Sequence, residues 1–185
     1  DHYILDIKDK DGHKDNIIVS FYNAQMRDID GYYKYKIRAV DKLGNIGQAS
    51  DWCGVTLDRI APTISDHSDI TLTEGETFPT STVSLTDNYG VSKVCGIGKD
   101  ITNGQETSEI CIDTDSSNLI GNQFKLMDVI KGQIEDWKNT TFTTVDLSII
   151  PAGQYQVTYY AYDKAGNKGN EQTFTITVVD NVPTV

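Results

Sequence analysis

Residues 153–169 read GQYQVTYYAYDKAGNKG, and residues 31–47 read GYYKYKIRAVDKLGNIG. The two stretches lie 122 positions apart and share Gly, Tyr, Ala, Asp-Lys, Gly-Asn and Gly in the same register. A second matching pair follows them, DRIAPTI at 58–64 and DNVPTV at 180–185, with one residue dropped. An internal repeat of this kind predicts two copies of one structural unit in tandem.

The repeated stretch has the pattern of a β-hairpin. Tyr155, Val157 and Tyr159 alternate with other residues at a period of two, which is typical of a strand with one buried face. In the Asp-Lys-x-Gly-Asn sequence that follows, we expect Asp163 to cap a turn with its side chain. Gly166 is expected to take the left-handed backbone conformation that closes this turn.

Short strand patterns separated by turn residues run along most of the chain, which favours an all-β antiparallel sandwich architecture. Pro62 and Pro183 suit domain boundaries, because proline fixes φ and donates no hydrogen bond to a ladder. We therefore predict a first domain at 1–60, either simply shorter or lacking part of its N-terminal half, and a second domain at 62–180. Residues 181–185 would begin a following linker or domain. Strands are expected near residues 2–8, 16–22, 32–41, 52–58, 69–73, 80–86, 91–98, 108–113, 142–148, 154–163 and 172–179.

The chain is acidic, and its charge is uneven. It has 16 Lys and Arg against 27 Asp and Glu, a formal net charge of −11. Residues 1–61 carry 9 basic and 10 acidic side chains, whereas residues 62–185 carry 7 and 17. Neither part has the basic patch that binds nucleic acid or an anionic membrane surface, so neither partner is expected. No apolar run approaches the roughly 18 residues that cross a bilayer, so we expect no membrane insertion within this segment.

Several short motifs together resemble the immunoglobulin-like repeats of bacterial surface and secreted proteins. The resemblance covers most of residues 58–185 apart from about 93–140, and the C-terminal half of the first domain is similar to fibronectin type III repeats as well. It implies tandem immunoglobulin-like antiparallel β-sandwiches in an extracellular protein, either at the cell surface or secreted. The motifs are APTI at 61–64, EGETF at 74–78, TDNYG at 86–90, GQYQVTY at 153–159 and DKAGN at 163–167.

The second domain departs from this family between Val91 and Phe142, where it carries a long inserted segment at about 93–140. Apolar residues at helical spacing predict a helix over about 122–138, weakened by Gly132 in its middle. Either this apolar stripe packs on the sandwich, or the insertion builds a recognition surface. The stripe consists of Phe124, Met127, Ile130, Ile134 and Trp137.

The chain has three cysteines, and two of them, Cys95 and Cys111, lie in the insertion on strands predicted to be adjacent. The extracellular setting that the resemblance implies permits disulfides, so we predict one between these two residues. Cys53 is then left over. It is either a buried small apolar residue beside Trp52 or the partner of a residue outside this sequence.

No arrangement of residues predicts catalysis, because nucleophile motifs, phosphate loops and zinc-ligand spacings are all missing from the sequence. Calcium is the one cofactor for which the sequence offers candidate ligands, because it takes six to eight oxygen ligands from carboxylates, amides and carbonyls. Carboxylates and amides fall in predicted turns and interdomain links, where they either bind calcium or only form the turns. The candidate ligands are Asp58, Asp87, Asn88, Asp163, Asn167, Asp180 and Asn181.

Three functions agree with these patterns. The first is a non-catalytic repeat module that acts as a stalk or spacer in adhesion, next to further immunoglobulin-like domains of the same chain. The second is a ligand- or carbohydrate-binding adhesin module that uses the insertion at 93–140 to bind a host or neighbouring-cell protein or glycan. In that case Trp137, Tyr160 and Tyr162 would stack on sugars. The third is a self-assembling filament or surface-layer subunit, in which Cys53 links copies.

Overall fold

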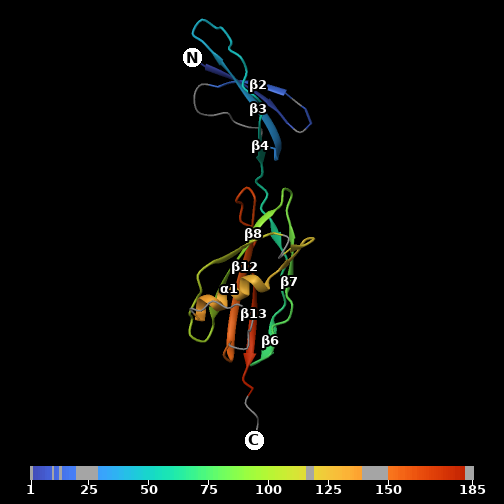
Figure 1. The fold of residues 1–185 in the computed structure, drawn as a ribbon, viewed down its shortest axis with the longest axis vertical. Helices are drawn as coiled ribbons and strands as arrows, with labels where there is room; N and C mark the ends of the chain where they lie inside the picture. The colour runs from blue at the N-terminus through green and yellow to red at the C-terminus, as the bar shows by residue number, and fades with distance from the viewer. Residues whose placement is uncertain are drawn as a thin grey trace. The chain divides into compact units, whose positions relative to one another are not determined.

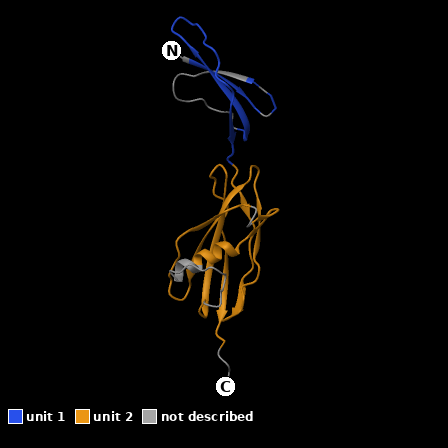
Figure 2. Ribbon diagram, in the orientation of Figure 1, with its two compact units in different colours: residues 1–59 blue, residues 60–185 orange. Residues whose placement is uncertain are grey.

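The structure is a computed structural model that describes residues 2–9, 11–12, 14–19, 29–115, 119–138 and 150–181. The chain divides into two compact units, Asp1–Arg59 and Ile60–Val185 (Figure 2). Within the described ranges the regular structure is almost entirely β-strand, with one helix (Figure 1). The predicted all-β class is therefore confirmed. No described helix is long and apolar enough to cross a membrane.

The described strands of the first unit form one antiparallel sheet. Its order is β2-β1-β3-β4, with β1 (His2–Lys8), β2 (Lys14–Val19), β3 (Gly31–Val40) and β4 (Cys53–Leu57). Side chains alternate across a strand, so the odd-numbered residues of β1 and β3 share one face. That face holds a small core of Leu5, Ile7 and Tyr33. The described part of this unit thus has one sheet, where a complete sandwich has two.

The second unit is a sandwich of two sheets. The larger sheet has the order β6-β13-β12-β8-β9, and the smaller one the order β10-β11-β7-β5. All neighbouring strands are antiparallel except β6 and β13, which run in parallel. The larger sheet consists of β6 (Ile70–Thr73), β8 (Val91–Asp100), β9 (Ile110–Asp113), β12 (Gly153–Asp163) and β13 (Gln172–Val179). The smaller sheet consists of β5 (Thr63–Ile64), β7 (Thr82–Thr86), β10 (Leu119–Ile120) and β11 (Gln123–Lys125).

The core of the second unit lies between these sheets. Val83 and Leu85 of β7 pack with Val157 of β12 and with Phe174 and Ile176 of β13, and all five are buried. Burying a side chain of this size contributes about 1.5–3 kcal/mol. The alternation in β12 that the sequence shows is therefore what places its apolar residues between the two sheets.

Helix α1 (Met127–Lys138) closes the core beside β8 and β9. A Cβ atom at Gly96 of β8 would lie 2.6 Å from Cγ1 of Val129, and one at Gly132 would lie 2.6 Å from Cγ2 of Ile110. Both glycines thus permit a close approach between helix and strands, and Ile130 of the helix is buried. Phe124, Met127 and Ile130 of the apolar stripe pack on the sandwich core, whereas the side chains of Ile134 and Trp137 lie outside the described residues.

The helix begins five residues later than predicted. Phe124 lies in β11, directly opposite Val83 of β7, and is buried there as a strand residue. Its spacing from Met127 and Ile130 fits a helix, but periodicity does not reveal that β7 offers a strand edge for pairing. The predicted strand at 142–148 lies outside the described residues. Residues 20–22 of the strand predicted at 16–22 also lie outside the described residues. The other predicted strands are confirmed, with described ends within two residues of those expected.

The two copies of the repeat fold alike. The Tyr155 O–H donates a hydrogen bond to the Pro151 carbonyl at 2.9 Å, and the Tyr33 O–H donates one to the Ile29 carbonyl. Such a bond to a carbonyl a few residues upstream is the tyrosine corner of β-sandwiches. After each long strand, the N–H of the last glycine of the repeat bonds back across the hairpin at 2.9 Å, from Gly47 to Ala39 and from Gly169 to Ala161.

Replacing Gly132 by alanine should destabilise the second unit, even though alanine favours a helix by about 1 kcal/mol over glycine. The added Cβ meets Ile110 at a distance that requires one of the two elements to shift. Overpacking of this kind costs about 1–3 kcal/mol, so after the helix-propensity gain we expect a net loss of up to about 2 kcal/mol in the free energy of unfolding. Urea denaturation measures it.

The double variant Gly132→Ala with Ile110→Ala provides the control for this prediction. It removes the Cγ2 atom that the new methyl group would meet, so its loss should be smaller than the sum of the two single losses. Additive losses, or a stabilising Gly132→Ala change, would show that the helix does not need a glycine here.

Candidate functional site

The turn after β12 is organised by one carboxylate. Asp163 Oδ1 accepts a hydrogen bond from the Asn167 N–H at 2.9 Å, and its Oδ2 accepts one from the Asn167 side-chain amide at 2.7 Å. Gly166 adopts a φ of 94°, as the sequence predicts for this position. Burial alone would raise the pKa of Asp163, but the hydrogen bonds from Asn167, Gly166 and Ala165 outweigh it and hold the pKa below its ordinary value.

The first unit contains the same turn in a more exposed setting. Asp41 Oδ1 accepts a hydrogen bond from the Asn45 N–H, and its Oδ2 accepts one from the Asn45 amide, both at 2.8 Å. These bonds, with the Asn45 side chain first, lower the pKa of Asp41. Asp41 is exposed, whereas only 2% of Asp163 is exposed. The local sequence therefore forms the turn in both settings.

A second carboxylate lies close to Asp163 within the second unit. Oxygens of Asp87 and Asp163 approach within 4.8 Å of each other. Asp87 Oδ2 accepts hydrogen bonds from the N–H groups of Tyr89 at 2.8 Å and Gly90 at 2.5 Å. Asp87 Oδ1 is buried and accepts none from the described residues. A buried carboxylate oxygen without a donor, beside a second carboxylate, is costly unless a cation compensates it.

The other candidate calcium ligands have different places. Asn167 uses its amide within the turn, and Asn88 lies in the loop beside Asp87. Asp180 follows β13 at the opposite end of the second unit from Asp163, so it does not join this pair. Asp58 follows β4 of the first unit and is 7% exposed.

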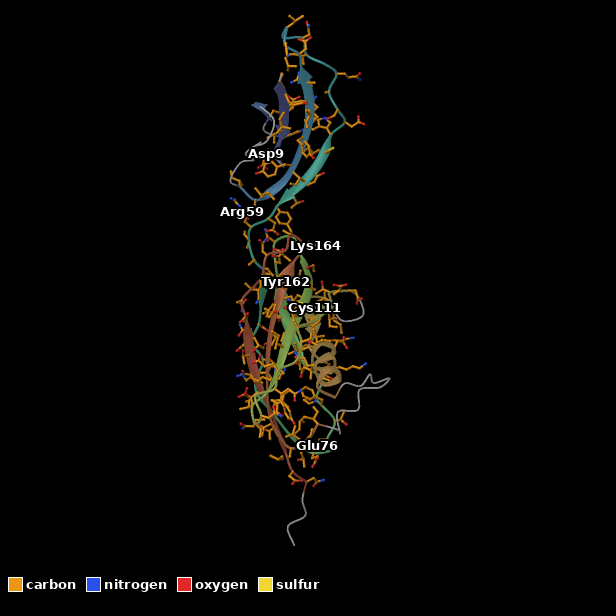
Figure 3. All side chains as sticks on the ribbon, turned by 90° about the vertical axis from the view of Figure 1, so that its left-hand side faces the viewer. Asp9, Arg59, Glu76, Cys111, Tyr162 and Lys164 are labelled. Carbon is orange, nitrogen blue, oxygen red and sulfur yellow. A yellow bond between two sulfur atoms is a disulfide. The ribbon has the colours of Figure 1, made fainter. Side chains whose placement is uncertain are left out.

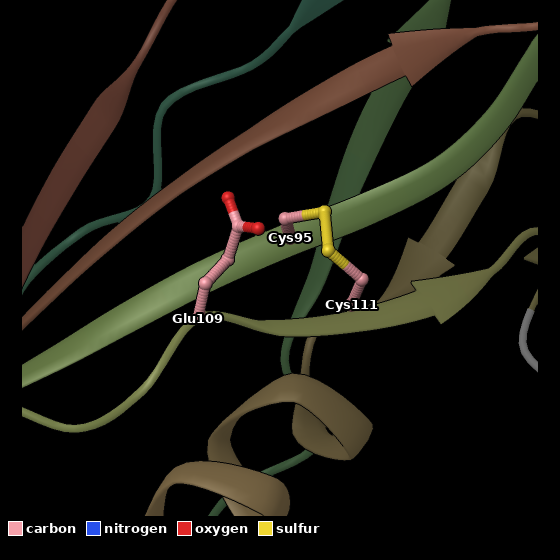
Figure 4. A group of neighbouring side chains, drawn as sticks. All are labelled: Cys95, Glu109 and Cys111. Carbon is pink, nitrogen blue, oxygen red and sulfur yellow. A yellow bond between two sulfur atoms is a disulfide. The ribbon is translucent and has the colours of Figure 1, made fainter.

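The predicted disulfide between Cys95 and Cys111 is confirmed. It joins directly opposite residues of β8 and β9, and Glu109 lies beside it (Figure 4). Cys95, Glu109 and Cys111 are of residue types that bind metal ions, but the two cysteine sulfurs are bonded to each other. Because thiolates are the form of cysteine that binds metal, this group is not a metal site.

The outer face of the larger sheet carries an aromatic cluster next to the disulfide. Tyr160 lies opposite Cys95 in the ladder, and its O–H donates a hydrogen bond to Glu109. The Lys168 Nζ lies 3.6 Å from the centre of the Tyr160 ring, and Lys168 also pairs with Glu171 at 2.6 Å. Burial and the hydrogen bond to Glu109 raise the pKa of Tyr160.

Stacking on a sugar requires an exposed ring, and Tyr160 does not have one. Tyr160 and Tyr162 share a face and touch edge to face with ring centres 5.8 Å apart, but Tyr160 is only 3% exposed. Its ring is covered by Lys168, while Lys93 lies over Tyr162, whose exposure is intermediate. Tyr160 therefore cannot serve as a free stacking surface. The side chain of Trp137 lies outside the described residues.

Sequence reasoning missed the residues that cover these rings. Lys93 and Lys168 come from strands and turns far apart in sequence, and Glu109 precedes β9 by one residue. One sequence signal was available for Lys168. It lies five residues after Asp163, so the repeated turn places it opposite Tyr162 on the returning strand. Cation–π contacts have no sequence spacing of their own, so only the fold reveals them.

Replacing Asp163 by asparagine should destabilise the second unit by about 2 kcal/mol, because hydrogen bonds to a charged group contribute about 1.5–3 kcal/mol. The matched change Asp41→Asn in the first unit should cost less, because Asp41 is exposed. Hydrogen exchange of peptides from each unit measures both effects.

A carboxyl with a lowered folded-state pKa stabilises the fold above its unfolded pKa. The Asp163→Asn difference should therefore shrink as the pH falls below 3.8. Equal losses at both positions would contradict the role of burial.

No known family model and no curated protein matches the sequence. Among solved structures, the chain is similar to the FN1–FN3 domains of chicken CNTN1, with 12% identity, 96% of this chain and 56% of that chain covered, and a TM-score of 0.43. It is also similar to a tetra-tandem repeat in the extending region of a large adhesion protein, with 16% identity, coverage of 96% and 41%, and a TM-score of 0.41.

Fibronectin(III)-like modules of Clostridium thermocellum CbhA are a further match, with 15% identity, coverage of 96% and 78%, and a TM-score of 0.36. The chain spans about half the length of the first two of these structures. At such identities the likeness concerns the fold alone. These structures are fibronectin type III-like domains and adhesion-protein repeats, the kinds of domain that the sequence motifs resemble.

Proposed function

We propose that this chain is a non-catalytic spacer module of an extracellular surface protein, one of a series of immunoglobulin-like domains that display a distal region. The observation that carries this proposal is the path of the chain through the second unit. The chain enters this unit at one end of its long strands and leaves at the other. A module with this path lengthens the polypeptide, whereas entry and exit at one end would fold it back.

Hydrogen bonds tie entry and exit to opposite ends of β13. At the entry, the Asn170 amide donates to the Ile64 carbonyl at 3.3 Å, just before β13 begins at Gln172. At the exit, the Glu74 N–H donates to the Val179 carbonyl at 2.8 Å. β13 is 8 residues long, and a strand rises about 3.3 Å per residue, so these ends lie about 25 Å apart. Lys164 and Glu76, labelled in Figure 3, lie at these two ends of the unit.

The described part of the insertion supports the spacer proposal over recognition by the insertion. Its side chains Phe124, Leu126 and Val129 are fully buried in the sandwich core. The segment therefore contributes to the stability of the module itself. The disulfide between Cys95 and Cys111 adds a covalent link of the kind found in oxidising compartments, which supports an extracellular location.

The strongly perturbed hydroxyls of the second unit support a structural role as well. Burial raises the pKa of Tyr159 to about 12, and its O–H donates a hydrogen bond to the Ser65 carbonyl at 2.9 Å. This bond joins the larger sheet to the segment after β5. The group is thus engaged in holding the sandwich together.

A module swap in the surface protein that carries this chain tests the spacer function. Deleting residues 60–181 should reduce adhesion, because the distal region is then held closer to the cell. Replacing them by an unrelated β-sandwich with entry and exit at opposite ends should restore it. The isolated chain should bind no glycan or host-matrix protein on a panel. A swap that abolishes adhesion, together with panel binding by the isolated chain, would overturn the spacer proposal in favour of recognition.

We further infer that calcium binds at the entry end of the second unit, with Asp87 and Asp163 as carboxylate ligands. The buried Asp87 Oδ1, which accepts no hydrogen bond from the described residues, supports this inference. Asp87 directly follows Thr86, which pairs with Thr63 of β5, so both carboxylates lie within the second unit.

Calcium should raise the thermal midpoint of the second unit, and Asp87→Asn should abolish this shift. Calcium sites of extracellular modules have dissociation constants of about 0.1–1 mM, and saturation at a hundred times that value stabilises by about 2.7 kcal/mol. The control is Asp100→Asn, because Asp100 caps a turn at the far end of the same unit through Thr102 N–H. It should keep the full shift. A wild-type chain that does not respond to calcium would contradict the site and leave the spacer proposal standing.

A further inference from the structure

The repeat allows the two units to be compared strand by strand. β3 corresponds to β12, since residues 31–40 align with 153–162. In each unit this strand pairs on one side with the strand after the turn, β4 or β13, and on the other with β1 or β8. β2 lies beyond β1, and β9 lies beyond β8, at one edge of each sheet. The sheet β2-β1-β3-β4 is therefore the counterpart of β9-β8-β12-β13.

Five strands of the second unit have no counterpart in the described part of the first, and three of them, β5, β6 and β7, concern the edge and the inner face of the larger sheet. β6 runs in parallel along the outer edge of β13, whereas no strand within the described ranges lies along the outer edge of β4. β5 and β7 cover the inner face of the larger sheet. All three strands precede β8 in the chain. Their counterparts would therefore precede β1, which begins at His2.

Equivalent inner-face positions differ in exposure between the two units. Tyr159 is fully buried, whereas Ile37, its counterpart, is 41% exposed. Phe174 pairs with Val157 and is 1% exposed. Its counterpart Cys53, which pairs with Tyr35 at the matching place, is exposed. The fully buried Ala161 likewise corresponds to the exposed Ala39.

The buried positions of the second unit are covered by the segment that begins at β5. The Tyr159 O–H donates to the Ser65 carbonyl, and the His67 ring lies 4.8 Å from the ring of Phe174. Ile64 and Val83 of the same segment are buried in the core. The segment of residues 63–86 therefore covers part of the inner face and also pairs with the edge of β13.

We propose that the apolar face of the first unit is a docking surface for β-strands built like residues 63–86, contributed by polypeptide outside residues 1–185 and joined to the start of β1. This segment would run in parallel along the outer edge of β4 and lay alternate apolar side chains over Ile37, Ala39 and Cys53. A segment in this place has the same chain order as β5, β6 and β7 before β8.

A second copy of the chain is a weaker occupant of this surface. Two facing sheets would cover each other's inner faces, but they would leave the outer edge of each β4 without a partner strand. The opposite face of the sheet is unsuited to docking of this kind, because Arg38 and Lys36 pair there with Asp6 at 2.7 and 3.9 Å. The sheet thus presents one apolar face and one charged face, and the apolar face is the one that needs a cover.

Alkylation of Cys53 tests the proposal, because Cys95 and Cys111 are held in a disulfide and Cys53 is the reactive thiol. The comparison is between the chain 1–185 and the same chain extended at its N-terminus by the roughly 30 residues that precede it in its parent protein. Iodoacetamide should modify Cys53 at least about tenfold more slowly in the extended chain, because docked strands bury the thiol. Amide exchange along β4 should slow in parallel, which reports pairing of its outer edge.

Two variants of the extended chain serve as controls. Ile37→Asp places a charge on the inner face and should restore fast alkylation. Lys34→Glu changes the opposite face and should leave alkylation slow. Circular dichroism confirms that each variant keeps its β-structure. An extended wild-type chain with fast alkylation and unprotected β4 amides would overturn the proposal. Protection that instead grows with the concentration of the chain 1–185 would also overturn it, and would identify a second copy as the cover.

Discussion

The inner face of β12 is the constraint on which the second unit depends. Tyr155, Val157, Tyr159 and Ala161 alternate along this strand, and all four are buried. β12 pairs on both sides, with β8 and β13, so its backbone hydrogen bonds are satisfied within the sheet. The apolar face can then be buried only by a second layer. The smaller sheet supplies part of that layer, and the helix, which has no place in a plain sandwich, supplies the rest.

The same strand also organises the outer face. A one-residue shift of β12 would exchange its two faces, and it would move Tyr160 away from Glu109 and the disulfide. The cluster of Tyr160, Lys168 and Glu109 therefore fixes the register from outside, while the core fixes it from inside. A module that is held from both faces and closed by a disulfide is suited to the spacer role proposed above.

The two-residue alternation of apolar side chains and the residue types of the turns made most of the fold predictable, because both act between residues that are close in sequence. The turn at Asp163 and Asn167 follows from a five-residue motif, and the disulfide follows from two cysteines on adjacent strands. Contacts between distant segments could not be predicted in this way. Phe124 fits a helix by its spacing, yet it lies in a strand because β7 offers it an edge. Asp87 and Asp163 are brought together only by the sandwich, and sequence spacing carries no sign of it.

The two copies of the turn separate the effect of local sequence from that of packing. Asp41 and Asp163 make the same two side-chain hydrogen bonds to an asparagine four residues on, so the motif alone is enough to form the turn. Only Asp163 is buried, and the strands around it are those that the described part of the first unit lacks. Burial is also what makes a carboxylate pair costly without a cation. It follows that a calcium site of this design requires a complete sandwich, and that the strands that would cover Ile37 would also decide whether Asp41 becomes part of such a site.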